Sequence, residues 1–136
     1  MPADFHLSVV APDRSVVEEV VRSLVAPGTE GYFGVFGGHV PLVASLKPGL
    51  LEYIDHSGNR HFVYVGGGFA EVQADRVTIL ADEAQSAREI DVAEAERRLE
   101  IARRALRGEA MDISNEEAVL EVERATSRIR AARSAR

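Results

Sequence analysis

The chain has 136 residues, of which 46% are hydrophobic, so it is long enough for one small domain with an appendage. A formal net charge of −6 excludes general nucleic-acid binding, which needs a basic face against phosphate. The absence of cysteine excludes a disulfide scaffold and thiolate chemistry, and it is typical of a cytosolic protein. We expect no membrane crossing and no export signal, because no apolar run approaches the roughly 20 residues of a spanning helix and no basic-then-apolar leader is visible.

Up to about Ala81 the hydrophobic pattern has period two. Phe5, Leu7 and Val9 alternate with more polar neighbours, and residues 62–65 form a return strand after the turn at residues 56–59. Turn residues recur about every ten positions, which is typical of a sandwich or barrel. The pattern therefore predicts an all-β sandwich or barrel over residues 1–87.

Glycine and proline interrupt two stretches of this first part. Residues 30–50 contain short apolar pieces separated by turn residues, namely Gly31, Gly34, Gly37, Gly38, Pro41, Pro48 and Gly49. Residues 66–68 are three consecutive glycines. They are not followed by the Lys-Ser or Lys-Thr of a phosphate-binding loop, so we expect a bulge or a close strand crossing there.

From Glu89 the period changes to that of a helix. Asp91 and Glu94 predict a capped start, Gly108 predicts a stop, and the segment 114–117 predicts a second capped start. One apolar stripe follows each start: Val92, Ala95, Leu99, Ala102 and Leu106, then Ala118, Val122, Ala125, Ile129 and Ala132. The short linker predicts an antiparallel two-helix hairpin over residues 88–136.

Half of these stripe positions are alanine, which buries little surface, whereas a buried Leu or Val contributes roughly 1.5–3 kcal/mol. We therefore expect the hairpin to hold together weakly and to dock weakly on the sandwich. Because alanine is the best helix former, each helix could persist if the pair separated. A movable element and a permanently folded cap are both compatible with this pattern.

The sequence contains no catalytic constellation. The acidic pairs Glu18-Glu19 and Asp82-Glu83 are adjacent, so on a strand their side chains point to opposite faces and cannot cooperate. His6, His56 and His61 fit solvent-facing strand or turn positions. His39 has no second histidine at ligand spacing and no cysteine near it, so we expect no metal site.

Three segments in the same order resemble one protein family. They are Glu30-Gly31-x-x-Gly34-Val35-x-x-Gly38-His39-x-Pro41-Leu42-Val43 with Leu46-Lys47-Pro48-Gly49, Phe62–Val72, and Val77–Ala84. Together with the length and order of segments over all 136 residues, they resemble the epsilon subunit of bacterial F-type ATP synthases. The resemblance implies the same fold, a β-sandwich followed by a helical hairpin.

The resemblance also implies a function. The chain would be a non-catalytic central-stalk subunit of the rotor of a proton-translocating ATP synthase, and it would help to couple rotation of the c-ring to ATP synthesis. Its sandwich would bind the gamma subunit and the c-ring. Its hairpin, when extended, would contact the catalytic beta and alpha subunits and restrain ATP hydrolysis. The location implied is peripheral, at the cytoplasmic face of the cell membrane.

The resemblance assigns roles to two groups of residues. Glu30, Tyr32 and His39 would lie in loops that face the c-ring, although His39 equally fits a loop histidine that satisfies backbone groups. The arginines at the end of the second helix would make the inhibitory contact: Arg124, Arg128, Arg130 and Arg133. Their placement also suits the negative end of the helix dipole.

Some family members bind regulatory ATP through the motif Ile/Leu-Asp-x-x-Arg-Ala. Here Ile90, Asp91 and Ala95 match that motif, but Glu94 replaces the arginine and would repel a polyphosphate. We therefore expect no cofactor, with regulatory ATP as the possible exception. A free-standing module that binds a small ligand, such as ATP, through the loops around His39 or through the hairpin is the alternative function.

Overall fold

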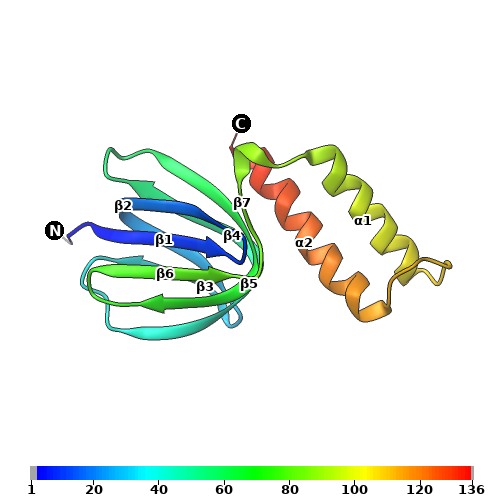
Figure 1. Cartoon of the computed structure of the whole chain (residues 1–136), viewed down its shortest axis with the longest axis horizontal. Helices are drawn as coiled ribbons and strands as arrows, with labels where there is room; N and C mark the ends of the chain where they lie inside the picture. The colour runs from blue at the N-terminus through cyan, green and yellow to red at the C-terminus, as the bar shows by residue number, and fades with distance from the viewer. Residues whose placement is uncertain (1–2, 136) are drawn as a thin grey trace.

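The computed structural model describes residues 3–135, which form seven strands, a 3-10 turn and two helices (Figure 1). The elements are β1 Phe5–Ala11, β2 Arg14–Gly28, β3 Gly31–Phe36, β4 Leu42–Asp55, β5 Arg60–Val72, β6 Arg76–Ala81, β7 Ala84–Ser86, the 3-10 turn Ala87–Glu89, α1 Val92–Leu106 and α2 Asn115–Ser134. Neither helix is long and apolar enough to span a bilayer.

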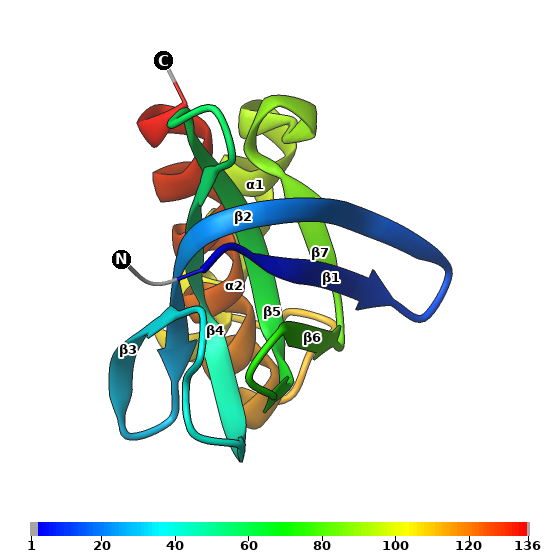
Figure 2. The ribbon, with the colours of Figure 1, turned by 90° about the vertical axis from the view of Figure 1, so that its left-hand side faces the viewer.

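The strands form one sheet that closes on itself. Its order is β1-β6-β5-β4-β2-β3, and β1 also pairs with β2, while β7 pairs with β5. The β1–β6 pair is parallel and the other pairs are antiparallel. Figure 2 shows this closed sandwich from the end away from the helices. The predicted fold, a β-sandwich or barrel followed by a helical hairpin, is confirmed.

The core lies inside the closed sheet and follows the predicted alternation. Phe5, Leu7 and Val9 of β1 are at most 2% exposed, and Val77 and Ile79 of β6 are fully buried. Each such side chain contributes about 1.5–3 kcal/mol relative to an exposed one. The period-two pattern is therefore explained by burial of one strand face.

The three glycines at residues 66–68 mark the point where β5 changes partners. Gly68 pairs with Ala81 of β6, and Val65 pairs with Ala84 of β7. The register of β5 against β4 runs through the glycines without a shift, so they form a close crossing and no bulge. Gly68 has φ +131°, and a Cβ there would lie 2.1 Å from the carbonyl oxygen of Leu80.

Both predicted helix starts are confirmed. The Asp91 side chain accepts a hydrogen bond from the backbone N–H of Glu94 at 3.1 Å, and Ser114 with Glu117 forms a capping box at the start of α2. The two helices pack side by side through small residues, as the alanine stripes predicted, with Ala102, Ala105 and Ala118 buried together.

The prediction that Leu106 belongs to the seam is wrong. Leu106 is 45% exposed, and Ala105 takes its place in the contact. Ala105 and Leu106 are three and four residues beyond buried Ala102, so they lie on either side of its direction and about 100° apart around the helix axis. The helix turns the side of Ala105 into the seam and leaves Leu106 at its edge.

Replacing Gly68 with alanine should destabilise the fold, because L-residues disfavour this φ and the new methyl group would collide with the backbone of β6. We expect the free energy of unfolding to fall by about 2–4 kcal/mol in urea titrations. The matched control is Gly34→Ala on β3, where the nearest atom would be 3.9 Å away and the change should stay within about 0.5 kcal/mol. Equal effects of the two substitutions would contradict the close crossing.

Candidate functional site at the contact between sandwich and hairpin

Helix α2 lies against the sandwich, and α1 lies on the far side of α2 (Figure 1). At the contact, Tyr64 of β5 is buried with Ala87 and Ala131, and partly buried Leu50, Phe62, Ile90 and Ala135 surround them. Ala131 allows α2 to approach the strands closely, but it contributes little apolar area of its own. The side of the contact that α2 provides is therefore made of small residues, while the large apolar side chains come from β4, β5 and Ile90. The expected weakness of the docking stays a prediction.

A charged cluster supplements this small apolar contact. Arg128 of α2 is 8% exposed, and its guanidinium carbon lies 4.6 Å from the centre of the Tyr64 ring. Its Nη2 donates a hydrogen bond to Oε1 of Glu83 at 2.7 Å, and the Tyr64 hydroxyl donates to the same oxygen. Burial, together with the Glu83 carboxylate, raises the pKa of Tyr64 above its ordinary value.

Arg124, one turn earlier on α2, extends the cluster. Its Nη2 donates to the carbonyl oxygen of Gly66 at 3.2 Å, and its Nε lies 3.5 Å from Oε1 of Glu83. We call Tyr64, Glu83, Arg124 and Arg128 the docking cluster. It joins the crossing of β5 and the segment after β6 to α2.

The docking cluster is incompletely satisfied. Among residues 3–135, three buried side-chain atoms lack a hydrogen-bond partner: Oε1 of Glu121, Nε of Arg124 and Nη1 of Arg128. A buried donor or acceptor without a partner costs about 1–3 kcal/mol. The ion pairs of Arg124 and Arg128 with Glu83 therefore stabilise the contact. The buried polar atoms without a hydrogen-bond partner destabilise it, because water could bind them if α2 separated.

The four arginines predicted to act together fall into two pairs. Arg124 and Arg128 are engaged within the chain by the docking cluster. Arg130 and Arg133 are exposed, and with Arg103 they line a groove of about 620 Å³ between the helices. Arg136, in the same basic segment, lies outside the described residues. The sequence did not predict that Arg124 and Arg128 bind Glu83 of the same chain, although their spacing of four residues placed them on one face of the helix.

The structure does not bring Glu30, Tyr32 and His39 together at one point. Glu30 lies in the turn between β2 and β3, and the Tyr32 hydroxyl accepts a hydrogen bond from the backbone N–H of Leu50 at 3.2 Å. His39 lies beyond the other end of β3, where its Nδ1 is 2.8 Å from its neighbour's carbonyl oxygen, that of Val40. This contact matches the alternative of a loop histidine that satisfies the backbone. The assignment of all three to the c-ring stays a prediction.

The residues of the nucleotide motif have structural partners. Ile90 packs at the hairpin contact, Asp91 caps α1, and Ala95 is 1% exposed. Glu94 forms ion pairs with Arg97 and Arg98, and these hydrogen bonds, first that from Arg97, hold its pKa at about 2.

The adjoining cleft, of about 630 Å³, is lined by six carboxylates and three arginines. The carboxylates are those of Asp13, Asp82, Glu83, Glu89, Asp91 and Glu94, and the arginines are Arg14, Arg98 and Arg128. This excess of negative charge disfavours a polyphosphate. Regulatory ATP therefore stays a prediction that the charge of the cleft does not favour.

A second surface stands out on the sandwich, away from α2. Val43 of β4, Phe69 of β5 and Leu80 of β6 are 71%, 56% and 52% exposed. Phe69 is paired with Leu80 across the strands, and Val43 is two residues from Ser45, the other partner of Phe69. We call these three residues the outer apolar row. Neighbouring exposed apolar side chains of this size are typical of an interaction surface.

Replacing Glu83 with glutamine should loosen α2, because buried Arg128 would lose its nearer charge partner and keep only Glu121, 3.8 Å away. We expect the hairpin contact to weaken by about 1–3 kcal/mol and the amide hydrogen exchange of α2 to accelerate accordingly. Glu89→Gln is the control, because its ion pair with Arg14 is largely exposed and should matter by less than about 1 kcal/mol. Unchanged exchange in the Glu83 variant would show that the docking cluster does not hold the helix.

Comparison with known proteins gives one consistent result. The model of the family "ATP synthase, Delta/Epsilon chain, beta-sandwich domain" matches residues 4–87. The ATP synthase epsilon chain of Nitratidesulfovibrio vulgaris (strain DP4) is 38% identical over 130 residues, which cover 96% of each chain. That of Solibacter usitatus is 39% identical over 129 residues, which cover 95% of this chain and 96% of the relative.

Solved structures agree with these relatives. A chain in the mitochondrial ATP synthase of Euglena gracilis, solved as OSCP/F1/c-ring, superimposes with a TM-score of 0.79 at 28% identity, over 99% of this chain and 82% of that one. A chain of the central stalk and c-ring of Tetrahymena thermophila ATP synthase shares the fold, with a TM-score of 0.61 at 15% identity over 98% and 97% of the two chains. The chain therefore belongs to the family of ATP synthase epsilon chains, as its sequence motifs predicted.

Proposed function

We propose that this chain is the epsilon subunit in the central stalk of an F-type ATP synthase, at the cytoplasmic face of a membrane. A member of this family is a non-catalytic subunit of the synthase. The observation that carries the proposal is a closed sandwich with an uncovered apolar row on one outer face. A closed sheet is stiff enough to transmit torque, and the outer apolar row is a suitable surface for a stalk partner.

We assign the outer apolar row to the gamma subunit. Val43, Phe69 and Leu80 come from three neighbouring strands, so their relative positions are fixed by the sheet. The turn at Glu30, Tyr32 at the start of β3 and the loop of His39 are then assigned to the c-ring. Both contacts together would let the sandwich couple ring rotation to ATP synthesis in the catalytic subunits.

The gamma assignment is tested by Phe69→Glu. A charge in the centre of the outer apolar row should abolish binding without unfolding the chain, because Phe69 is already 56% exposed. We expect the variant to lose co-purification with gamma. Val119→Glu is the control, since Val119 is similarly exposed, at 50%, but lies on α2. Full recovery of gamma with the Phe69 variant would contradict this assignment.

We further propose that residues 88–136 act as a regulatory arm on the rotor-binding part, residues 1–87. In the compact form Arg124 and Arg128 are bound to Glu83. When α2 leaves the sandwich, they become free to join Arg130 and Arg133. These four cations would suit an acidic surface of the catalytic beta or alpha subunits, and that contact would restrain ATP hydrolysis. Support comes from the small residues that α2 brings to the apolar contact and from the unsatisfied atoms of Arg124 and Arg128 in the docking cluster.

Two variants should change ATP hydrolysis in opposite directions in the reconstituted complex. Truncation after Ala87 removes the arm and should raise hydrolysis severalfold. Glu83→Gln weakens the compact form and should lower hydrolysis, because it increases the extended population. If both variants hydrolyse ATP like the intact chain, the arm has no inhibitory role; if both raise it, the arm does not act by leaving Glu83.

A further inference from the structure

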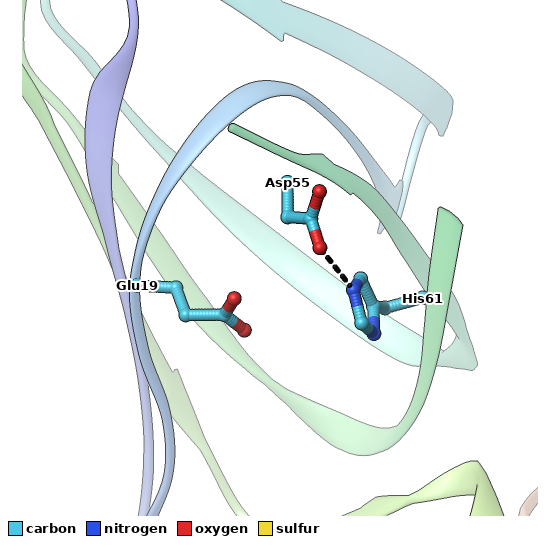
Figure 3. A group of neighbouring side chains, drawn as sticks. All are labelled: Glu19, Asp55 and His61. Atoms are coloured by element: carbon cyan, nitrogen blue, oxygen red, sulfur yellow. Dashed lines mark hydrogen bonds and ion pairs between the residues drawn. The ribbon is translucent and has the colours of Figure 1, made fainter. Parts of the chain in front are cut away.

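Three potential metal ligands from three strands meet at one edge of the sandwich. Glu19 lies on β2, Asp55 ends β4, and His61 lies on β5 (Figure 3). One ligand atom of each lies within 4.8 Å of the others, and all three residues are half-buried. Strand pairing brings these residues together. Asp55 is paired with Val21, which is two residues from Glu19 on β2. His61 is paired with Tyr53, which is two residues from Asp55 on β4.

The charges at this edge are not balanced. Within residues 3–135, neither Glu19 nor Asp55 forms an ion pair with a lysine or arginine. Asp55 is hydrogen-bonded to His61, with 2.8 Å between Oδ2 of Asp55 and Nε2 of the ring. Figure 3 shows the Glu19 carboxylate directed towards this pair. Two carboxylates facing one imidazole leave an excess of negative charge, which a bound cation would neutralise.

Neighbouring groups already hold the three side chains in place. Oδ1 of Asp55 accepts hydrogen bonds from the backbone N–H groups of Ser57 and Asn59, both at 2.9 Å. Oε2 of Glu19 accepts one from the Tyr53 hydroxyl at 2.6 Å. The His61 ring stacks on Tyr53, with centroids 4.7 Å apart and planes at 16°. Such second-layer contacts orient metal ligands in known sites.

We propose that Glu19, Asp55 and His61 bind one Zn²⁺ ion. The atoms left for the ion are Oε1 of Glu19, Oδ2 of Asp55 and Nε2 of His61. Two ligands of tetrahedral zinc lie about 3.3 Å apart when each bond is about 2.0–2.1 Å. One ligand atom of each residue already lies between 2.8 Å and at most 4.8 Å from those of the others, so small side-chain rotations would bring three ligands to that spacing. Water would complete the coordination.

The bound ion would connect β2, β4 and β5. Since the unfolded chain does not hold these ligands together, zinc binding would stabilise the folded state by mass action. Local spacing in the sequence predicted no metal site. It did not indicate this cluster because its members come from strands that are adjacent only after folding.

The test is calorimetric titration of the full chain with ZnCl₂ in a non-chelating buffer. We expect one saturable site per chain. His61→Gln removes the nitrogen ligand but keeps a hydrogen-bond donor for Asp55, and Glu19→Gln keeps an acceptor for the Tyr53 hydroxyl. Each should weaken zinc binding by at least about 10–100-fold, the loss that is typical when only an outer-shell partner of a ligand is removed. His56→Gln is the matched control. His56 lies in the turn between β4 and β5 and is paired with Asp4, so its replacement should leave the zinc affinity unchanged.

Thermal unfolding supplies a second readout on the same proteins. Zinc should raise the melting temperature of the intact chain and of the His56 variant, and EDTA should reverse the rise. At the same zinc concentration the rise should be much smaller for the His61 and Glu19 variants, whose folding in the absence of zinc is checked by circular dichroism. Absence of saturable binding up to about 1 mM zinc, or equal affinity in both ligand variants and the intact chain, would overturn the proposal.

Discussion

Side chains from the two parts of this molecule meet at one carboxylate oxygen, Oε1 of Glu83. It accepts hydrogen bonds from Arg128 and from the Tyr64 hydroxyl, and Arg124 lies beside it. A partly buried ion pair of this kind loses much of its Coulomb attraction to desolvation, so it gives orientation more than strength. Because α2 brings mainly alanine to the surrounding apolar contact, the charge cluster supplies the specific interactions that fix where α2 sits on the sandwich.

The position of that carboxylate depends on the glycines of β5. Gly66 to Gly68 allow the chain after β6 to cross close to β5, where Gly66 donates its N–H to the carbonyl oxygen of Glu83. This backbone contact holds Glu83 at the edge of the sandwich next to α2. A backbone feature that could be taken for a phosphate loop therefore positions the docking residue.

Local patterns in the sequence predicted the fold well. The alternation of Phe5, Leu7 and Val9 indicated a buried strand face, and the caps at Asp91 and Ser114 indicated the helix starts, because each depends on residues close together in the chain. Contacts between distant residues could not be predicted in this way. Arg128 meets Glu83 only once α2 has docked, and Glu19 meets His61 only in the closed sheet. The family motifs carried the resemblance but could not reveal either cluster.

Packing of α1 mainly on α2, with the 3-10 turn Ala87–Glu89 before both, has a mechanical consequence. At 1.5 Å per residue, α1 is about 22 Å long and α2 about 30 Å. If the seam opened and the helices lay end to end, the far tip would stand about 50 Å from the turn. A change within one short backbone segment could thus be read out about 50 Å away from it. The capped starts and alanine content of the helices would keep each of the two helical segments of such a lever stiff.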